Sequence, residues 1–143
     1  MIAIGSDHGG YELKKEIIGY LEANGFAYKD FGCDGPGAVD YPDYAKPVCQ
    51  AILAGEADKG ILICGTGIGI SITANRIKGI RAALAHDVFS AEATRLHNDA
   101  NVLCMGGRVV GGGLALKITD TFLKTEFSGD ERHARRISKI EGE

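Results

Sequence analysis

The chain has 143 residues, among them 16 Lys or Arg and 19 Asp or Glu, which gives a formal net charge of -3. This length suits one domain with a sizeable core, so we expect residues 1–143 to form a single domain. The slightly acidic balance argues against nucleic acid or an anionic membrane as a partner, and no apolar stretch reaches the ~20 residues of a membrane span.

Short apolar runs alternate with segments of helical period along the whole chain. In the first helical segment Leu13, Ile17 and Leu21 share one face, and Gly25 supplies a left-handed stop. The pattern predicts strands over residues 1–5, 27–31, 60–64, 80–85 and 102–105, helices over residues 10–24, 44–54, 69–77, 88–96 and 112–124, and a terminal helix over residues 130–140 with Ile137 and Ile140 turned inward.

This alternation indicates an α/β fold. Strands joined through helices pair in parallel with right-handed crossovers. Because the strands are mostly apolar, we expect them to be buried on both faces and covered by helices above and below. The sequence therefore predicts a three-layer α/β/α sandwich of Rossmann-like type, with a five-stranded parallel sheet and a C-terminal helix.

Polar residues follow the predicted strands. In an open parallel sheet the ligand binds beyond the carboxyl ends of the strands. We expect Asp7 and His8 there after the first strand, Cys64 and Thr66 after the third, His86 and Asp87 after the fourth, and Arg108 after the fifth. We also expect the end of the fourth helix, with His97 and Asn98, at this same edge.

A glycine-rich segment opens the third helix, where residues 65–69 read GTGIG. Consecutive amide N–H groups and the helix dipole make such a loop an anion site. A dinucleotide fingerprint would need glycine where Ile70 stands, but Asp87 lies at a suitable distance for a ribose-binding acid. A small nucleotide-binding module therefore stays open as an alternative.

The four cysteines, Cys33, Cys49, Cys64 and Cys104, form no C-x-x-C pair and have no histidine at zinc-finger spacing. We expect reduced thiols and a soluble protein of the cytoplasm. Cys64 is either a small buried apolar residue or, since it precedes the glycine-rich helix start, a thiol that readily becomes a thiolate. We regard the other three as structural.

The histidines and arginines each allow two interpretations. His8 and His97 are turn and helix-end residues, or functional groups; with Asp7 and His86 they would supply ligands for a metal-dependent hydrolase, although no usual ligand spacing occurs. Arg132 and Arg136 share one helix face, as a solvated basic surface or as a phosphate clamp.

Five separated segments together resemble the type B ribose-5-phosphate isomerases. They are residues 6–10 (SDHGG), 64–69 (CGTGIG), 97–101 (HNDAN), 106–108 (GGR) and 132–136 (RHARR), and they span essentially the whole chain. The wider family includes allose-6-phosphate and galactose-6-phosphate isomerases. The resemblance implies aldose-ketose isomerisation of a small sugar phosphate, ribose 5-phosphate to ribulose 5-phosphate in the pentose phosphate pathway, through an enediolate and without metal or organic cofactor.

The resemblance also implies a role for each site residue. Cys64 matches the base and His97 the ring-opening acid, with Asp7 and Thr66 near the sugar hydroxyls. The amides of Gly65, Thr66, Gly67, Ile68 and Gly69 match the site for the enediolate oxygens. Arg108, Arg132 and Arg136 match the phosphate ligands, with His8 nearby, and Asn98 matches a sugar ligand.

Two positions refine the resemblance. Some family members carry serine in place of the cysteine and use a glutamate shortly after the loop; here Cys64 and Ile70 favour the cysteine branch. The terminal arginines follow Asp130 and Glu131, so two acids stand beside the expected clamp. Family members work as dimers or larger assemblies with shared sites, and we expect a homodimer or homotetramer.

Overall fold

Five parallel strands form one sheet in the computed structural model, which describes residues 1–143. The strands are β1 (Ile2–Ser6), β2 (Tyr28–Asp30), β3 (Lys59–Cys64), β4 (Ala82–Leu84) and β5 (Val102–Gly106). Their order across the sheet is β2-β1-β3-β5-β4, and every neighbouring pair is parallel. The predicted five-stranded parallel sheet is confirmed.

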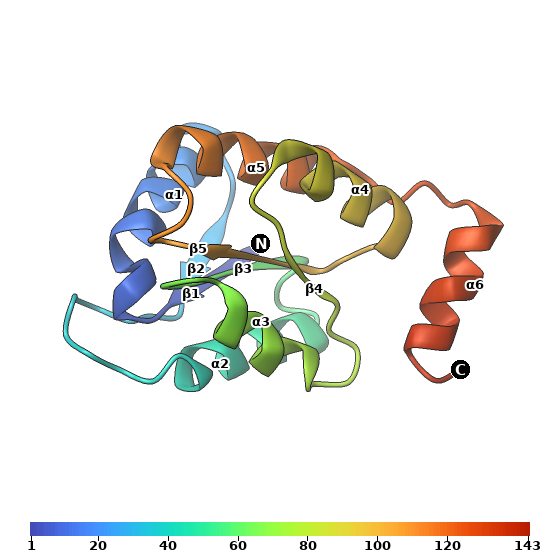
Figure 1. Cartoon of the computed structure of the whole chain (residues 1–143), viewed down its shortest axis with the longest axis horizontal. Coiled ribbons are helices and arrows are strands. Elements are labelled where there is room, and N and C mark those ends of the chain that lie inside the picture. Colours follow the sequence, from blue (N-terminus) through green and yellow to red (C-terminus); the bar gives the residue numbers. More distant parts are fainter.

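Six α-helices and one short 3-10 helix surround the sheet (Figure 1). They are η1 (His8–Gly10), α1 (Tyr11–Ala23), α2 (Pro42–Leu53), α3 (Ile68–Asn75), α4 (Val88–Asn98), α5 (Gly112–Lys124) and α6 (Glu131–Ile140). Figure 1 shows α1, α4 and α5 over one face of the sheet and α2 and α3 over the other, while α6 stands at one side. The predicted three-layer sandwich is therefore confirmed. None of these helices combines the length and apolar character that crossing a bilayer requires.

The core consists of two apolar clusters, one on each face of the sheet. β1 and β5 are buried throughout, and β3 is buried from its second residue onward. The expectation that all five strands are buried on both faces is wrong for β2 and β4, where Leu84 is 40% exposed. These two strands form the edges of the sheet, so each has a neighbour on one side only.

Helix α1 follows its predicted pattern. Leu13, Ile17 and Leu21 are buried, and Gly25 adopts φ +74° directly after the helix. Lys14 is also buried, at 1% exposure, which its position among polar residues did not predict. Its ammonium group donates to an Asp30 carboxylate oxygen at 2.8 Å and to the Cys33 carbonyl at 2.5 Å, so the buried charge is paired.

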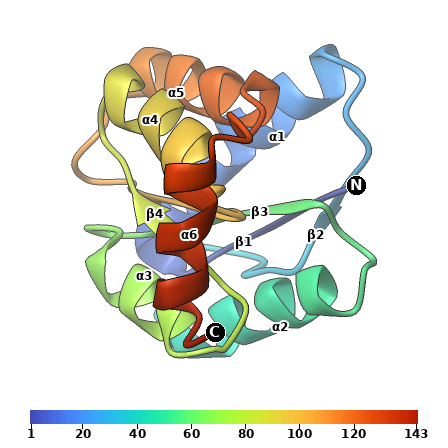
Figure 2. The ribbon, with the colours of Figure 1, turned by 90° about the vertical axis from the view of Figure 1, so that its right-hand side faces the viewer.

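The terminal helix forms as predicted, but its packing differs. Figure 2 shows α6 standing across the edge of the sheet, outside the three layers. None of its residues is buried, and Ile140 is 63% exposed. The inward orientation predicted for Ile140 is therefore wrong, and Ile137 is only partly buried. The sheet is already covered on both faces by the other helices, so α6 has no open core face to cover.

The chain reverses its direction of travel across the sheet between β1 and β3. From β1 it passes through α1 to β2, and from there through α2, on the opposite face, back past β1 to β3. The loops after β1 and β3 therefore turn to opposite faces of the sheet. Ligands of open parallel sheets bind at such a point, and the candidate site is built there.

Candidate active site

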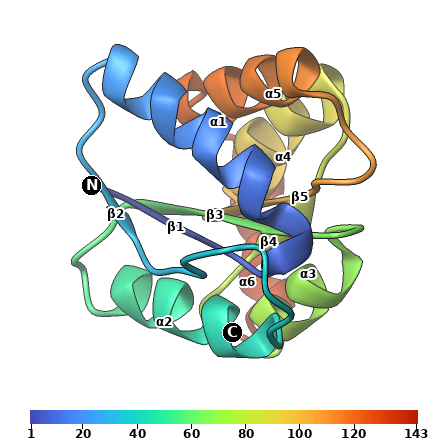
Figure 3. The ribbon, with the colours of Figure 1, turned by 90° about the vertical axis from the view of Figure 1, so that its left-hand side faces the viewer.

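The loops that follow β1, β3 and β5 come together at the carboxyl edge of the sheet, on the right-hand side of Figure 3. The Gly107 N–H donates to the Cys64 carbonyl at 2.8 Å, and the Arg108 N–H donates to the Gly65 carbonyl at 3.0 Å. A Cβ atom on Gly107 would lie 2.5 Å from the Gly9 carbonyl oxygen. Only glycine therefore allows the loops after β1 and β5 to approach this closely.

Cys64 is the last residue of β3, and it is 4% exposed. Its Sγ accepts the N–H of Gly67 at 3.1 Å. Gly67 adopts φ +78°, which turns the loop back toward the sulfur before α3 begins. The loop thus places a hydrogen-bond donor at the sulfur, beside the start of α3.

The glycine loop offers more donors than it uses internally. The Gly67 N–H is directed at Cys64, and the Ile68 N–H donates to Thr66 Oγ1 at 3.2 Å. The N–H groups of Gly65, Thr66, Gly69 and Ile70 donate to no protein acceptor. An anionic oxygen placed at this loop would find several preorganised donors close to the Cys64 sulfur.

Asp7 and His8 reach the same edge from β1. Asp7 is 6% exposed, and its Oδ1 accepts the N–H of Gly10, which caps η1. His8 Nδ1 accepts the N–H of Val39 at 3.1 Å. A neutral His8 that accepts a hydrogen bond at Nδ1 carries its proton on Nε2, so Nε2 can donate a hydrogen bond to a ligand.

Two residues of the loop before α2 also belong to the site, and the sequence patterns did not single them out. Val39 orients His8 through its backbone N–H, which no side-chain pattern reveals. Tyr41 packs against the glycine loop, since a Cβ atom on Gly69 would lie 2.7 Å from the Tyr41 hydroxyl oxygen. The position of Tyr41 directly before the helix-starting Pro42 is the signal that could have drawn attention to it.

Arg108 extends over the glycine loop. A Cβ atom on Gly65 would lie 3.1 Å from its Nη1, and the side chain is exposed and forms no ion pair within the chain. The structure thus brings together Asp7, His8, Cys64, Thr66 and Arg108 at one edge, as the sequence predicts.

His97 and Asn98 lie at the opposite edge, and the prediction that they share the strand ends is wrong. Helix α4 returns against the strand direction and has 11 residues, so at 1.5 Å per residue its two ends are about 16 Å apart. His97 lies instead beside α6, where its ring stacks on the His133 ring with centroids 4.4 Å apart. Desolvation, and next the charge of His97, lower the pKa of His133 below its usual value.

Arg132 and Arg136 share this second edge, on α6. The Arg132 guanidinium donates to both carboxylate oxygens of Asp130, at 3.2 and 3.3 Å. The hydrogen bond from Arg132 lowers the pKa of the Asp130 carboxyl. Arg136 is exposed and forms no ion pair. The chain therefore carries two separate groups of candidate residues, one around Cys64 at the end of β3 and one around His97 near the end of α4.

The other cysteines take no part in either group. Burial raises the pKa of Cys49 to about 11 and raises that of Cys104 well above its usual value. Cys33 donates through Sγ to the Gly35 carbonyl at 3.2 Å. All three are buried, and their structural role stays a prediction.

The two alternative sites are not assembled. Of the four candidate metal ligands, His86 Nε2 accepts the Gly106 N–H at 2.9 Å, and His97 lies at the far edge. No three His, Cys, Asp or Glu side chains converge as a metal site requires. Asp87, the candidate ribose ligand, is the N-cap of α4 and accepts the Ser90 N–H at 2.8 Å.

Comparison with known proteins gives consistent results. The sequence profile of the Ribose/Galactose Isomerase family matches residues 2–140. A putative sugar phosphate isomerase of Bacillus subtilis is 59% identical over 97% of this chain and 93% of its own. Ribose-5-phosphate isomerase B of Escherichia coli is 48% identical, again over 97% of this chain and 93% of its own. A solved structure of ribose-5-phosphate isomerase B from Clostridium thermocellum superposes with a TM-score of 0.96 and 55% identity, over 99% of this chain and 95% of that one.

Proposed function

The chain belongs to the ribose/galactose isomerase family, whose members are sugar phosphate isomerases, and we propose that it interconverts ribose 5-phosphate and ribulose 5-phosphate. The resemblance seen in the sequence motifs is thereby confirmed at the level of the family. The relatives named for ribose 5-phosphate support this substrate. Allose 6-phosphate and galactose 6-phosphate are the alternatives, and residues 1–143 act as one catalytic domain.

The active site is completed by a second copy of the chain. The Cys64 group and the His97 group lie on opposite edges of one copy, so neither alone holds all the expected residues. A two-fold arrangement about the β4 edge would set the His97 edge of one copy over the Cys64 edge of its partner. An exposed apolar face on that side supports this contact: Ile68, Ile72, Leu84, Val88 and Phe89 are between 37% and 77% exposed. The assembly is thus a homodimer or a homotetramer of such dimers.

The first chemical step opens the sugar ring. His97 of the second copy gives a proton to the ring oxygen as the C1–O bond breaks. The C1 hydroxyl passes its proton to the Asp7 carboxylate of the first copy, and C1 becomes an aldehyde. Asp7 and Thr66 of the first copy bind the sugar hydroxyls. Asp7 accepts no protein hydrogen bond besides that of Gly10, and the Thr66 hydroxyl keeps its proton free to donate. A histidine is suited to this work because it exchanges protons near neutral pH.

The second step moves a proton between two carbons. The Cys64 thiolate takes the proton from C2, and the electron pair of that C–H bond forms the C1–C2 double bond of an enediolate. The negative oxygens accept hydrogen bonds from free amides of the glycine loop. The Cys64 thiol then returns its proton to C1, and a proton passes from the C2 oxygen to the C1 oxygen, which yields the ketose. No metal or organic cofactor takes part.

The phosphate is held away from the reacting carbons. Arg108 of one copy and Arg132 and Arg136 of the other surround it, His8 donates through Nε2, and Asn98 binds the sugar. Because the arginines hold the unreactive end of the sugar, C2 is kept next to Cys64 in the orientation that proton transfer needs. The four unpaired cysteines suit a reducing compartment such as the cytoplasm.

The observation that carries this proposal is the Gly67 N–H aimed at the buried Cys64 sulfur beside unused loop amides. The direct test is the rate of ketose formation from ribose 5-phosphate, allose 6-phosphate and galactose 6-phosphate, side by side in EDTA. We expect turnover to be fastest with ribose 5-phosphate and unaffected by the chelator. Turnover that EDTA abolishes would contradict the metal-free mechanism, and no turnover of any sugar would overturn the proposed function.

A further inference from the structure

Helix α6 carries two arginines of the proposed phosphate clamp, yet packing does not fix its position. None of its residues is buried. A cavity of about 580 Å³, lined among others by Ile80, Asn98 and Ile140, lies between the body and the end of α6. Surface helices are normally held by an apolar face against the core. Since α6 buries none of its residues, individual side-chain contacts must hold it against the body of the protein.

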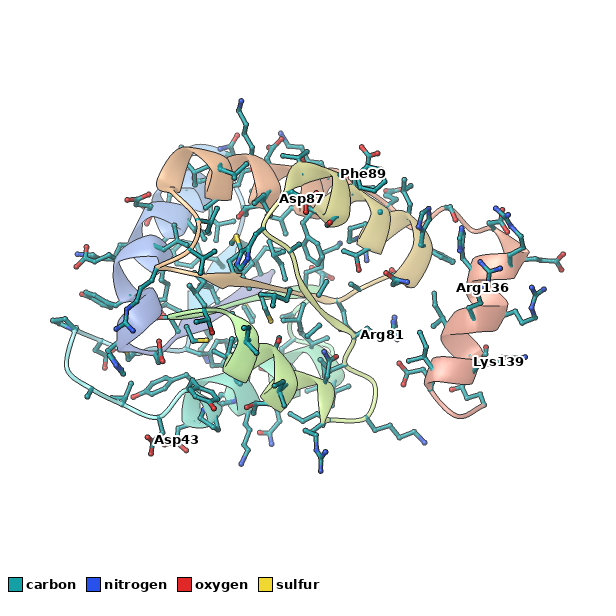
Figure 4. All side chains as sticks on the ribbon, in the orientation of Figure 1. Asp43, Arg81, Asp87, Phe89, Arg136 and Lys139 are labelled. Carbon is teal, nitrogen blue, oxygen red and sulfur yellow. The ribbon has the colours of Figure 1, made fainter.

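Two such contacts connect α6 to the body, one near each end. Near its start, the His133 ring stacks on His97. At its end, Glu141 forms an ion pair with Arg81, with 2.9 Å between Oε1 and Nη1. The side chains of Arg81 and Glu141 are only 19% and 14% exposed, so this pair is better shielded than a surface ion pair. Figure 4 shows Arg81 on the side of the body that faces α6.

The same guanidinium group holds the end of α4. Its Nε donates to the Asn98 carbonyl and its Nη2 to the Asp99 carbonyl, each at 2.9 Å. The last carbonyls of a helix have no partner within the helix, so Arg81 satisfies two of them. The planar guanidinium holds its donors in a fixed fork, so Arg81 contacts three acceptors from two elements at the same time.

We propose that Arg81 is a positioning residue for the isomerase reaction: its guanidinium fixes Asn98 on α4 and Arg136 on α6 relative to each other, so that both reach one sugar phosphate. This inference rests on the proposed function. Arg81 itself touches no substrate. It sets the geometry with which the second copy presents its ligands to the Cys64 edge of the first.

The test is steady-state kinetics of Arg81→Met with ribose 5-phosphate, with inorganic phosphate as a competitive inhibitor. Misplacing α6 weakens the grip on the phosphate, so we expect KM and the inhibition constant of phosphate to rise about ten-fold, while kcat changes much less. Glu141→Gln removes the charge from the contact to α6, which weakens that contact, and it leaves both carbonyl contacts of Arg81 in place. We expect it to raise KM by a smaller factor, and the double variant to be no worse than Arg81→Met alone, because both act through one bridge.

Arg76→Met is the matched control. Arg76 lines the same cavity, but its side chain is exposed and forms no ion pair. Arg76→Met should leave KM unchanged. A rise in KM equal to that of Arg81→Met would mean that the loss of a positive charge, and not the misplacement of α6, is responsible, and it would overturn the inference. Size-exclusion chromatography and thermal melts should match the wild type for Glu141→Gln, which carries the test alone if Arg81→Met does not fold or assemble.

Arg136→Ala separates the two proposals. If it leaves KM unchanged, the phosphate clamp itself fails. If it raises KM while Arg81→Met and Glu141→Gln do not, the clamp stands and only the positioning role of Arg81 is overturned.

Discussion

The two edges of this chain are built in different ways. Around Cys64, the groups that meet are mostly backbone atoms at the ends of buried strands, and glycines hold three loops in contact. Around His97, exposed side chains extend from helix ends, and α6 buries none of its residues. The first edge has little freedom to adjust, whereas the second depends on a few polar contacts.

This difference matches the division of labour in the proposed mechanism. Proton transfer at carbon demands that the base and the oxyanion donors be placed to within a fraction of an ångström. A phosphate lies away from the reacting carbons, so the arginines that hold it act on binding and orientation and not on proton transfer itself. We therefore expect changes at the Cys64 edge to lower kcat and changes at the α6 edge to act mainly on KM.

The largest effect should come from Cys64→Ser. A serine hydroxyl is not ionised near neutral pH, so the variant lacks the base, and we expect kcat to fall by about 10³-fold, within the range for loss of a general base. KM should stay within a few-fold, because the phosphate and hydroxyl ligands are intact. The measurement is initial-rate kinetics with ribose 5-phosphate.

Cys49→Ala provides the comparison for that variant. Cys49 lies on α2, is as buried as Cys64 and belongs to the same apolar cluster, but no loop amide donates to its sulfur. It should keep the wild-type kcat even if its melting temperature falls. A Cys64→Ser enzyme with near-normal turnover would assign Cys64 a structural role and require another base.

A smaller loss of kcat is expected from Gly107→Ala. The new Cβ would lie 2.5 Å from the Gly9 carbonyl oxygen, so the loop that carries Asp7 and His8 must move. A displacement of about 1 Å at reacting groups costs roughly 10²-fold in rate, and we expect a fall in kcat of that order. Thermal melts should show destabilisation from overpacking as well.

Gly111→Ala controls for the loss of a glycine in the same connection. Nothing lies within 4 Å of a Cβ at that position, and its φ of -73° suits any residue. We expect its kinetics to be unchanged. Wild-type kcat in Gly107→Ala would show that the Cys64 edge adjusts as readily as the α6 edge, which would remove the contrast between them.

The sequence predicts most of this fold because each element carries its own pattern. The face formed by Leu13, Ile17 and Leu21 defines α1, and the apolar run of β3 defines a buried strand. Strand order is not written in any such pattern. Leu84 belongs to an apolar run like the others, and only its position at the sheet edge leaves it exposed.

The candidate site is predictable where it follows strand ends and not where it depends on distant partners. Asp7, Cys64 and Arg108 follow parallel strands and therefore meet. His97 lies in the last turn of a helix that runs against the strands. Its motif therefore marks it as a candidate site residue but does not predict at which edge of the sheet it lies. The proposed role of Arg81 depends on its contact with Glu141, 60 positions further along the chain. The sequence around Arg81, a single arginine before a short strand, does not predict this contact.

The smallest effect concerns the acid beside the clamp. Asp130 caps α6 through the Arg132 N–H and also pairs with the Arg132 guanidinium. Asp130→Asn keeps an oxygen for the cap, since asparagine is an equally good N-cap, but it frees the guanidinium for phosphate. We expect KM for ribose 5-phosphate to fall about two-fold with kcat unchanged, an effect of the size of an exposed ion pair.

Two controls, the ionic strength and the variant Glu131→Gln, test the explanation for the lower KM of Asp130→Asn. The gain should shrink as ionic strength rises, because exposed charges are screened. Glu131→Gln removes the same charge one residue away, where the side chain is exposed and pairs with no cation. If both variants lower KM equally, general charge is responsible; a fall in KM for Asp130→Asn alone would show that Asp130 competes with the substrate for Arg132. An unchanged KM in Asp130→Asn would mean that Arg132 does not bind the phosphate, and would leave Arg108 and Arg136 to hold it.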